Sequence, residues 1–238
     1  MTDISFLLVS LEDYRPQIEK ILSLETGFSY EIIVCSNHFY DEYTDNKTVI
    51  FVEDKEKSGS CSAFNQAYKN SSGEYLITVT GVIIPPDNVY ETILELKHQE
   101  KNNCKLVITS LSCSTGTVCP VPRGFPGRLP GSAGARKSVE VLRWPAFSKK
   151  TIEKYLGGNI WPQEFKHHYM DNWLGTYCFL MGEPKKSLKN VCVQDVAHKS
   201  KIKLDDHDLK VYKKLCYDQG ANKEDVVYSL EKNEYYKK

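Results

Sequence analysis

Short apolar runs alternate with amphipathic stretches through the first half of this chain. Five runs rich in Ile, Leu and Val span residues 4–9, 31–35, 48–52, 75–79 and 105–110. The near-continuous apolar run at residues 4–9 is typical of a strand that is buried on both faces of a parallel sheet. Between the five runs, helical spacing of apolar residues begins near Pro16, Ala63 and Pro86, and proline is tolerated in a first helical turn. The pattern predicts an α/β fold, a Rossmann-type open, twisted, mostly parallel sheet flanked by helices.

The second half continues the alternation after a long irregular segment. Ser148 is placed to cap a helix that the Gly157–Gly158 pair ends, and residues 171–181 carry the apolar stripe of another helix. Residues 190–195 have the pattern of a short strand. From residue 199 onward, charged residues alternate with an apolar stripe, which predicts a helical tail.

Composition and charge exclude several classes of protein. The 238 residues carry a formal net charge of zero, so no global charge predicts binding to nucleic acid or to a membrane surface. No run approaches the roughly 20 apolar residues of a membrane-spanning helix. The eight cysteines are scattered without a C-x-x-C pair, as is typical of reduced thiols, so we expect a cytoplasmic protein.

The stretch from residue 59 to residue 88, GSCSAFNQAYKNSSGEYLITVTGVIIPPDN, carries the clearest functional signal. Gly59 and Asn65 belong to a short helix and its approach, and Gly73-Glu74-Tyr75 precedes a buried strand. This spacing resembles family-two inverting glycosyltransferases of the GT-A fold, in which a Gly and a later Asn flank the donor site. In that family, Gly-Glu-Tyr opens a strand that ends in Asp-x-Asp. The resemblance covers residues 3–200 and implies a UDP- or GDP-sugar as donor.

The positions of the Asp-x-Asp motif are occupied here by Thr80, Gly81 and Val82. In the family these carboxylates hold Mg²⁺ or Mn²⁺, hard ions that prefer oxygen ligands. His198 stands where relatives keep a histidine near the metal and the diphosphate. Three options follow: protein cations neutralise the diphosphate directly, metal binds weakly through phosphate and water, or catalysis is lost. We favour the first option.

Other donor-site candidates follow the carboxyl ends of the predicted strands. Ligands of open α/β sheets bind beyond these ends, so Ser10, Ser36, Thr80 and Gly81 should lie near one crevice. The resemblance places Glu12 near the ribose, with an exposed loop acid as the alternative. Relatives end the second strand in Asp-Asp, whereas here the strand continues as Ser-Asn-His from Ser36, so we expect neutral hydrogen bonds to recognise the base.

The irregular segment at residues 111–136 is basic. No acidic residue lies between Glu100 and Glu140, and Arg123, Arg128 and Arg136 fall in this interval. Guanidinium groups present a planar fork of donors that suits phosphate oxygens. We interpret the segment as a lid over a diphosphate, with a solvated basic loop or a surface for an acidic partner as the alternatives.

Asp171 lies at the start of a predicted helix, where the helix dipole and free amide groups stabilise a carboxylate. The family's Glu-Asp-x-Asp segment, which supplies the general base, matches Met170, Asp171 and Trp173, so only the middle carboxylate is present. The resemblance therefore implies that Asp171 deprotonates the acceptor hydroxyl. Trp161 and Trp173 are candidates for stacking on an acceptor sugar, with core packing as the alternative.

The sequence thus predicts a GT-A-like domain over residues 1–200, with a donor half to about residue 110 and an acceptor half after it, and a helical appendage over residues 201–238. The predicted activity is transfer of a hexose to a glycan or lipid-linked acceptor with inversion. The alternative is an inactive relative that binds a nucleotide-sugar or glycan, or scaffolds an active partner. A homo-oligomer stays open. A nucleotidyltransferase is disfavoured, because its Gly-rich signature is missing after the first strand.

Overall fold

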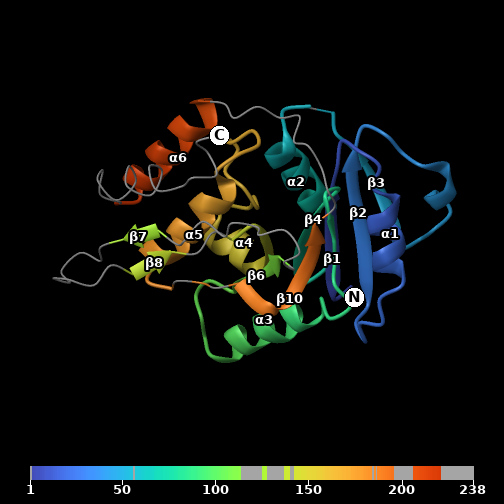
Figure 1. Cartoon of the computed structure of the whole chain (residues 1–238), viewed down its shortest axis with the longest axis horizontal. Helices are drawn as coiled ribbons and strands as arrows, with labels where there is room; N and C mark the ends of the chain where they lie inside the picture. Colours follow the sequence, from blue (N-terminus) through green and yellow to red (C-terminus); the bar gives the residue numbers. More distant parts are fainter. Residues whose placement is uncertain are drawn as a thin grey trace.

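The computed structural model describes residues 2–55, 57–113, 125–127, 137–139, 142–183, 185, 187–195 and 206–220. Within these ranges, eight strands form one sheet in the order β3-β2-β1-β4-β9-β6-β10-β5 (Figure 1). The strands are β1 (Ile4–Val9), β2 (Tyr30–Ser36), β3 (Val49–Glu53), β4 (Tyr75–Thr80), β5 (Ile83–Ile84), β6 (Ile108–Cys113), β9 (Trp144–Ser148) and β10 (Ser187–Asp195). A separate antiparallel pair joins β7 (Phe125–Gly127) and β8 (Lys137–Val139).

The large sheet is mixed. β1 pairs in parallel with both β2 and β4, so that Ile4 lies opposite Tyr30 on one side and Tyr75 on the other. The β2–β3 and β6–β10 pairs are also parallel. β9 runs antiparallel to β4 and β6, and β5 runs antiparallel to β10. The predicted α/β fold with a largely parallel sheet is confirmed, and its antiparallel strands were not predicted.

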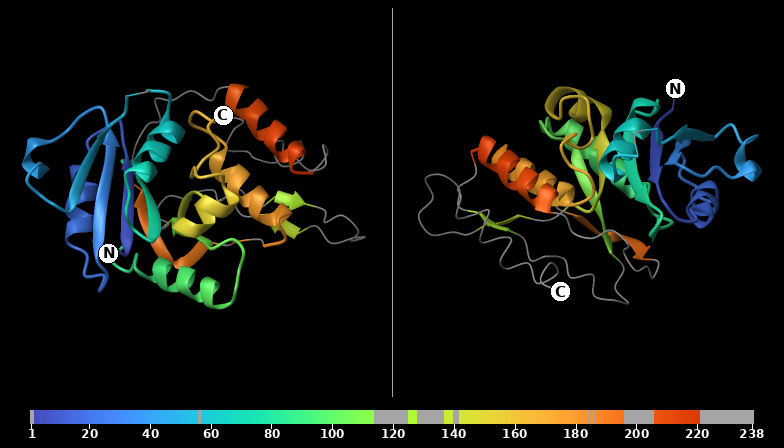
Figure 2. Two further views of the ribbon diagram at one scale, coloured as in Figure 1. Left: turned by 180° about the vertical axis from the view of Figure 1, so that it is seen from behind. Right: turned by 90° about the horizontal axis from the view of Figure 1, so that it is seen from above.

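Helices cover both faces of this sheet (Figures 1 and 2). α1 and α3 pack on one face, and α2, α4, α5 and α6 share the core on the other. In β1, Phe6 and Leu8 point to the first core and Leu7 and Val9 to the second, as the period of two requires. The helices are α1 (Arg15–Leu22), α2 (Ser60–Lys69), α3 (Glu91–Lys101), α4 (Lys149–Tyr155), α5 (Met170–Leu180) and α6 (Asp206–Asp218), with a 3-10 turn at Asp41–Tyr43.

Helix limits follow local chemistry. The Ser148 hydroxyl accepts a hydrogen bond from the Thr151 N–H at 3.4 Å, which confirms the predicted cap of α4. Gly157 and Gly158 both have positive φ and lie just after that helix. α3 begins at Glu91, later than predicted, because the chain after Pro86 first forms turns.

The Ser-Ser-Gly turn before β4 is fixed by a buried carboxylate. Glu31 accepts hydrogen bonds from the Ser5 hydroxyl at 2.6 Å, from the Ser72 N–H at 2.5 Å and from the Gly73 N–H at 3.2 Å. A Cβ at Gly73 would lie 2.5 Å from the Ser5 Oγ and 2.6 Å from its nitrogen. The glycine of the Gly-Glu-Tyr sequence is therefore needed for close packing of the turn against β1.

α6 packs back onto the domain. Its Tyr212 and Cys216 are buried in the same core as Leu174 and Cys178 of α5. None of the described helices is both long enough and apolar enough to cross a bilayer.

Candidate active site

Parallel strands β1, β2 and β4 end at one edge of the sheet, which we call the carboxyl edge. Here the Ser36 hydroxyl donates to the Ser10 carbonyl at 3.0 Å, and the Gly81 N–H donates to the Val9 carbonyl at 3.2 Å. A Cβ on Gly81 would lie only 1.9 Å from the Ser10 Oγ. Ser10 thus contacts both Ser36 and Gly81, so these three residues lie close together, as the strand pattern predicted.

The Ser10 hydroxyl shapes the turn that follows β1. It accepts from the Glu12 N–H at 3.0 Å and lies 3.1 Å from the Glu12 carbonyl, to which it donates. The Glu12 side chain is exposed at this edge. The turn therefore leaves the Glu12 side chain exposed at the carboxyl edge, whereas Ser10 is buried; the predicted role of Glu12 at the donor ribose stays a prediction.

The three positions of the Asp-x-Asp motif lie at the end of β4 and offer few metal ligands. The Thr80 Oγ1 is buried and has no hydrogen-bond partner among the described residues, and Val82 packs against the apolar core. Gln17 of α1, itself buried, donates to the Gly81 carbonyl at 2.9 Å. Across the described ranges, no three His, Cys, Asp or Glu side chains gather to hold a metal ion. One hydroxyl does not fit Mg²⁺ or Mn²⁺, so we derive no step through a metal.

Gly59 brings the start of α2 against another part of the protein. Its φ is +117°, and a Cβ there would lie 2.4 Å from the Lys166 carbonyl oxygen. The Cys61 N–H donates to the same carbonyl at 3.1 Å, and the Ser60 N–H donates to the His167 Nδ1 at 3.2 Å. Burial lowers the pKa of His167, which favours the neutral ring that this bond needs. The absence of a side chain at Gly59 therefore allows a close approach to protein backbone at Lys166.

The side-chain amide of Asn65 bonds to protein backbone at both ends. Its amide nitrogen donates to the Trp161 carbonyl at 2.9 Å, and its oxygen accepts from the Trp161 N–H at 3.1 Å. Asn65 is buried in α2 rather than placed at the helix start. This position corrects the expectation that Asn65 bonds a ligand, because both ends of its amide are already used.

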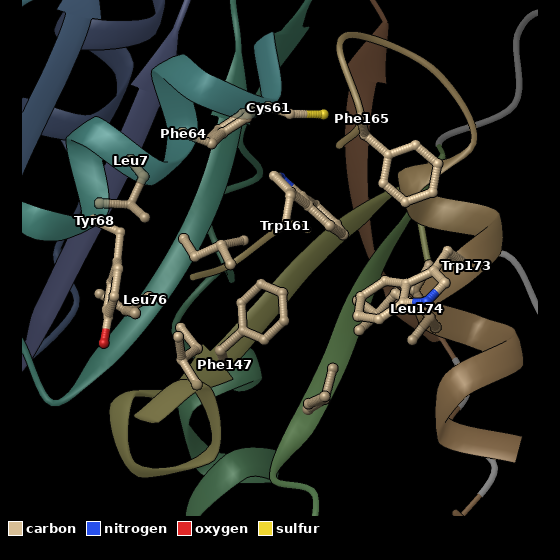
Figure 3. Close-up of a cluster of buried hydrophobic side chains, with 14 of the residues drawn as sticks. Leu7, Cys61, Phe64, Tyr68, Leu76, Phe147, Trp161, Phe165, Trp173 and Leu174 are labelled. Atoms are coloured by element: carbon tan, nitrogen blue, oxygen red, sulfur yellow. The ribbon is translucent and has the colours of Figure 1, made fainter. Parts of the chain in front are cut away.

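The two tryptophans lie in the core, which corrects their predicted role (Figure 3). Trp161 is 2% exposed and packs edge-to-face on Phe147, with ring centroids 6.1 Å apart. Trp173 is 4% exposed and lies between Phe165 and Tyr177. Neither ring presents a face to solvent on which an acceptor sugar could stack.

Asp171 lies in the first turn of α5 and is partly buried. Its Oδ1 accepts the Asn172 N–H at 2.9 Å. Burial raises the pKa of the Asp171 carboxyl above its ordinary range, although the Arg143 charge and the Asn172 hydrogen bond oppose this rise. A carboxylate with a raised pKa is better suited to accept a proton near neutral pH than an exposed one.

The register of β9 places Asp171 at the carboxyl edge. β9 is antiparallel to β4, with Ile77 opposite Ala146, so the start of β9 lies at the end where β4 finishes. Leu142, which precedes β9, donates its N–H to the Asp171 carbonyl at 3.4 Å. The predicted base therefore lies at the carboxyl edge, where β4 ends.

Two neighbours of Asp171 were missed as site residues. The charges of Arg143 and His168 both lower the pKa of Asp171, so both side chains lie near it. The Nε2 of His168 is buried without a partner in the described part of the chain. Arg143 could have been found only from the pairing of β9, and His168 from its position three residues before the acid.

Arg123, Arg128, Arg136 and His198 lie outside the described residues. The chain on either side of the arginine segment is at the carboxyl edge, because Leu111 of β6 pairs with Trp144 of β9. The end of β10 lies beside the segment after β4, since Asp195 pairs with Ile83.

No protein-family model matches this chain, and no curated protein sequence matches it significantly. Its fold is similar to residues 1–349 of TarS from S. aureus, with a TM-score of 0.63, 12% identity, and coverage of 98% of this chain and 70% of that one. TarS has also been solved in complex with UDP-GlcNAc. The chain covers 42% of a longer TarS chain.

Two further similar structures are glycosyl-transferring enzymes from other organisms. The mannosyltransferase PcManGT from Pyrobaculum calidifontis, in complex with GDP-Man and Mn²⁺, gives a TM-score of 0.58 at 15% identity, over 84% of this chain and 60% of that one. Glucosyl-3-phosphoglycerate synthase from Mycobacterium tuberculosis gives 0.57 at 16% identity, over 93% and 80%. This chain has the GT-A-type glycosyltransferase fold.

Proposed function

We propose that this protein is a nucleotide-sugar-dependent glycosyltransferase. It transfers a hexose from a UDP- or GDP-sugar to a hydroxyl of a glycan or lipid-linked acceptor, with inversion. The observation that carries the proposal is Asp171, a carboxylate with a raised pKa in the first turn of α5, at the carboxyl edge of a GT-A-type sheet. Similar structures that bind UDP-GlcNAc, GDP-Man and UDP support the choice of donor class.

In this mechanism Asp171 is the general base. Its carboxylate accepts the proton of the acceptor hydroxyl as that oxygen bonds to the anomeric carbon on the face opposite the diphosphate. The bond from the anomeric carbon to the diphosphate oxygen breaks, and the nucleoside diphosphate leaves with the electron pair. The raised pKa of Asp171 matches the task, because it lies closer to neutrality than that of an exposed aspartate.

The donor lies against the carboxyl edge in this proposal. Ser10, Glu12, Ser36, Thr80 and Gly81 form the protein side of its nucleoside and phosphate contacts, and no carboxylate stands at the end of β4 to repel the diphosphate. Gly59 and Asn65 shape this region through their contacts with residues 161–167.

Positive charge for the departing diphosphate comes from the arginine segment. Guanidinium groups of Arg123, Arg128 and Arg136, with His198, neutralise the leaving group, a type of electrostatic stabilisation that is worth several kcal/mol in other enzymes. The attachment of both flanks of the segment at the carboxyl edge supports this assignment.

The test is a donor titration with and without a chelator. Wild type should bind and turn over at least one of UDP-glucose, UDP-GlcNAc and GDP-mannose in EDTA, with the configuration of the product read by NMR. Arg128→Ala should weaken donor binding, and Arg15→Ala, which removes an exposed arginine paired with Asp13, should not. Transfer that requires Mn²⁺ would contradict neutralisation by protein cations.

One observation favours a second function, a nucleotide-sugar binding module without activity. The positions that hold the metal in the resembled family carry Thr80, Gly81 and Val82. Donor binding with no turnover across a broad panel of acceptors would support the module and contradict the enzyme.

A further inference from the structure

Asp208 of α6 holds the chain just before α5. Its side chain is 0% exposed and accepts hydrogen bonds from three successive backbone N–H groups. Lys166 donates at 2.8 Å, His167 at 2.9 Å and His168 at 2.8 Å. Hydrogen bonds to an ionised carboxylate are among the strong ones in proteins, so this segment is tightly fixed to α6.

Tyr212 holds the next residue of the same segment. Its ring stacks on Tyr169 with centroids 5.8 Å apart and an interplanar angle of 21°. Tyr169 has φ +63°, a left-handed conformation that is rare for a bulky residue and persists only where its surroundings hold it. The Tyr212 hydroxyl also lies 3.3 Å from the Thr176 Oγ1 on α5. α6 therefore contacts the chain on both sides of the strained residue that precedes α5.

The opposite side of the segment faces α2. The Lys166 carbonyl accepts the Cys61 N–H at 3.1 Å, and the Met170 sulfur lies 2.9 Å from the Cys61 sulfur. The segment 166–169 is thus fixed between α6 and the first turn of α2, and it leads directly into Asp171. In Figures 1 and 2, α6 lies alongside α5, at the end of the domain away from β3.

We propose that α6 is a positioning element of the active site: Asp208 and Tyr212 hold residues 166–169 so that Asp171 keeps its productive orientation. This inference rests on the proposed role of Asp171 as general base and extends it to a part of the chain that the sequence pattern sets apart as an appendage. Asp208 and Tyr212 are positioning residues, since they act through the segment and not on substrate.

A purely structural anchor makes a different prediction. If α6 only covers the core, weakening its contacts lowers the stability of the whole domain and leaves Asp171 unchanged in every folded molecule. If α6 positions Asp171, the titration of that carboxyl and the turnover number both change while the protein stays folded. Active-site geometry displaced by about 1 Å can cost on the order of a hundredfold in rate.

The first experiment replaces Asp208 with Asn in the full chain. The Asn keeps one acceptor oxygen but loses the charge, so the amides of residues 166–168 should exchange with solvent about tenfold faster or more. NMR should also find the titration of Asp171 shifted, and kcat reduced with the donor KM unchanged. Asp206→Asn, an exposed acid in the same helical turn, is the matched control and should change none of these.

A second pair of variants tests the ring stack. Tyr212→Leu keeps an apolar side chain but removes the stack on Tyr169, and should shift the titration of Asp171 and reduce kcat. Tyr212→Phe keeps the ring stack and removes only the hydroxyl contact to Thr176, so it should change both quantities less than Tyr212→Leu does. If Asp208→Asn and Tyr212→Leu both leave the Asp171 titration unchanged, the positioning inference is wrong. A wild type that transfers no sugar overturns the proposed function, whereas the titration still decides the role of α6.

Discussion

Replacing Asp171 with Asn should remove transfer and leave the fold intact. The amide oxygen can still accept the Asn172 N–H that now bonds Oδ1 at 2.9 Å, so the start of α5 keeps its geometry. The amide cannot take the proton of the acceptor hydroxyl. A positioned general base contributes about 10²- to 10⁴-fold, which corresponds to about 3–5 kcal/mol of transition-state stabilisation. We therefore expect kcat to fall by that factor.

The same change should have the opposite effect on stability. Burial raises the pKa of Asp171 in the folded protein, so the native state favours the neutral acid. The contribution of such a group to stability is largest below its unfolded pKa of about 4 and declines as the pH rises through the folded value. Asn cannot ionise and has no such decline. The free energy of unfolding of the variant should therefore rise relative to wild type between about pH 4 and pH 7.

Urea denaturation at pH 4 and pH 7 measures the expected rise in the free energy of unfolding, and a transfer assay at pH 7 measures the expected fall in kcat. Glu164→Gln is the matched control, because it changes an exposed acid on the connection before α5. The reasoning is refuted if Asp171→Asn transfers sugar within about twofold of wild type. It is also refuted if the variant loses stability at neutral pH, since the carboxylate would then have a structural role.

Three further changes probe the surroundings. Arg143→Gln removes a charge that lowers the pKa of Asp171, so the rising limb of the pH–rate profile should move to higher pH. Gly81→Ala puts a methyl group 1.9 Å from the Ser10 Oγ and should cost about 1–3 kcal/mol in urea denaturation, much of which Ser10→Gly should restore in the double variant. Glu31→Gln should lower the free energy of unfolding by about 1.5–3 kcal/mol, because the amide accepts fewer of the hydrogen bonds that fix the turn before β4.

Each of these has an outcome that contradicts it. Lys150→Gln, which removes an exposed charge on α4, is the control and should leave the pH–rate profile unchanged. If Arg143→Gln also fails to move the rising limb, the side chains of Arg143 and Asp171 do not interact. A double variant no more stable than Gly81→Ala would mean that the steric clash is not the cause. An unchanged urea midpoint in Glu31→Gln would show that the hydrogen bonds of Glu31 make no net contribution to the free energy of unfolding.

The central strands could be predicted from the sequence, because burial on both faces leaves an unbroken apolar run. β1 spans residues 4–9 as expected, and β4 exceeds its predicted range by one residue, Thr80. The start and end of α4 could also be predicted, because the capping serine and the glycine pair are adjacent in sequence to the helix that they limit. These features depend on contacts that are local or that any buried strand requires.

β9 could not be predicted in the same way. Its sequence, Trp144–Ser148, contains Pro145, and proline within a run argues against a central strand. The structure places Pro145 opposite Ser110 and uses its carbonyl to accept the Thr78 hydroxyl at 2.8 Å. Arg143, whose charge lowers the pKa of Asp171, directly precedes β9, so missing this strand also concealed a residue that acts on the predicted base.

The candidate site also contains residues whose positions could be predicted from the strand pattern and residues whose positions could not. The proximity of Ser10 to Ser36 and Gly81 could be predicted, because parallel strands bring their carboxyl ends together. Asn65 was misassigned because its hydrogen-bond partner, the Trp161 backbone, lies 96 positions along the chain, a pairing that only the tertiary fold creates. Residue type alone could not separate an amide that binds a ligand from one that ties a helix to a loop.

Residues 80–82 at the end of β4 carry no carboxylate, and this has a consequence for any transfer reaction. Gln17, which bonds the Gly81 carbonyl at 2.9 Å, and Ser10, which bonds Glu12, are neutral side chains and add no positive charge at this position. A departing diphosphate needs that charge, and the basic segment between β6 and β9 is anchored at both flanks to the same edge. If transfer is independent of metal, it must therefore depend on the arginines of that segment. Transfer that survives EDTA but ignores every one of those arginines would remove the physical basis of the mechanism.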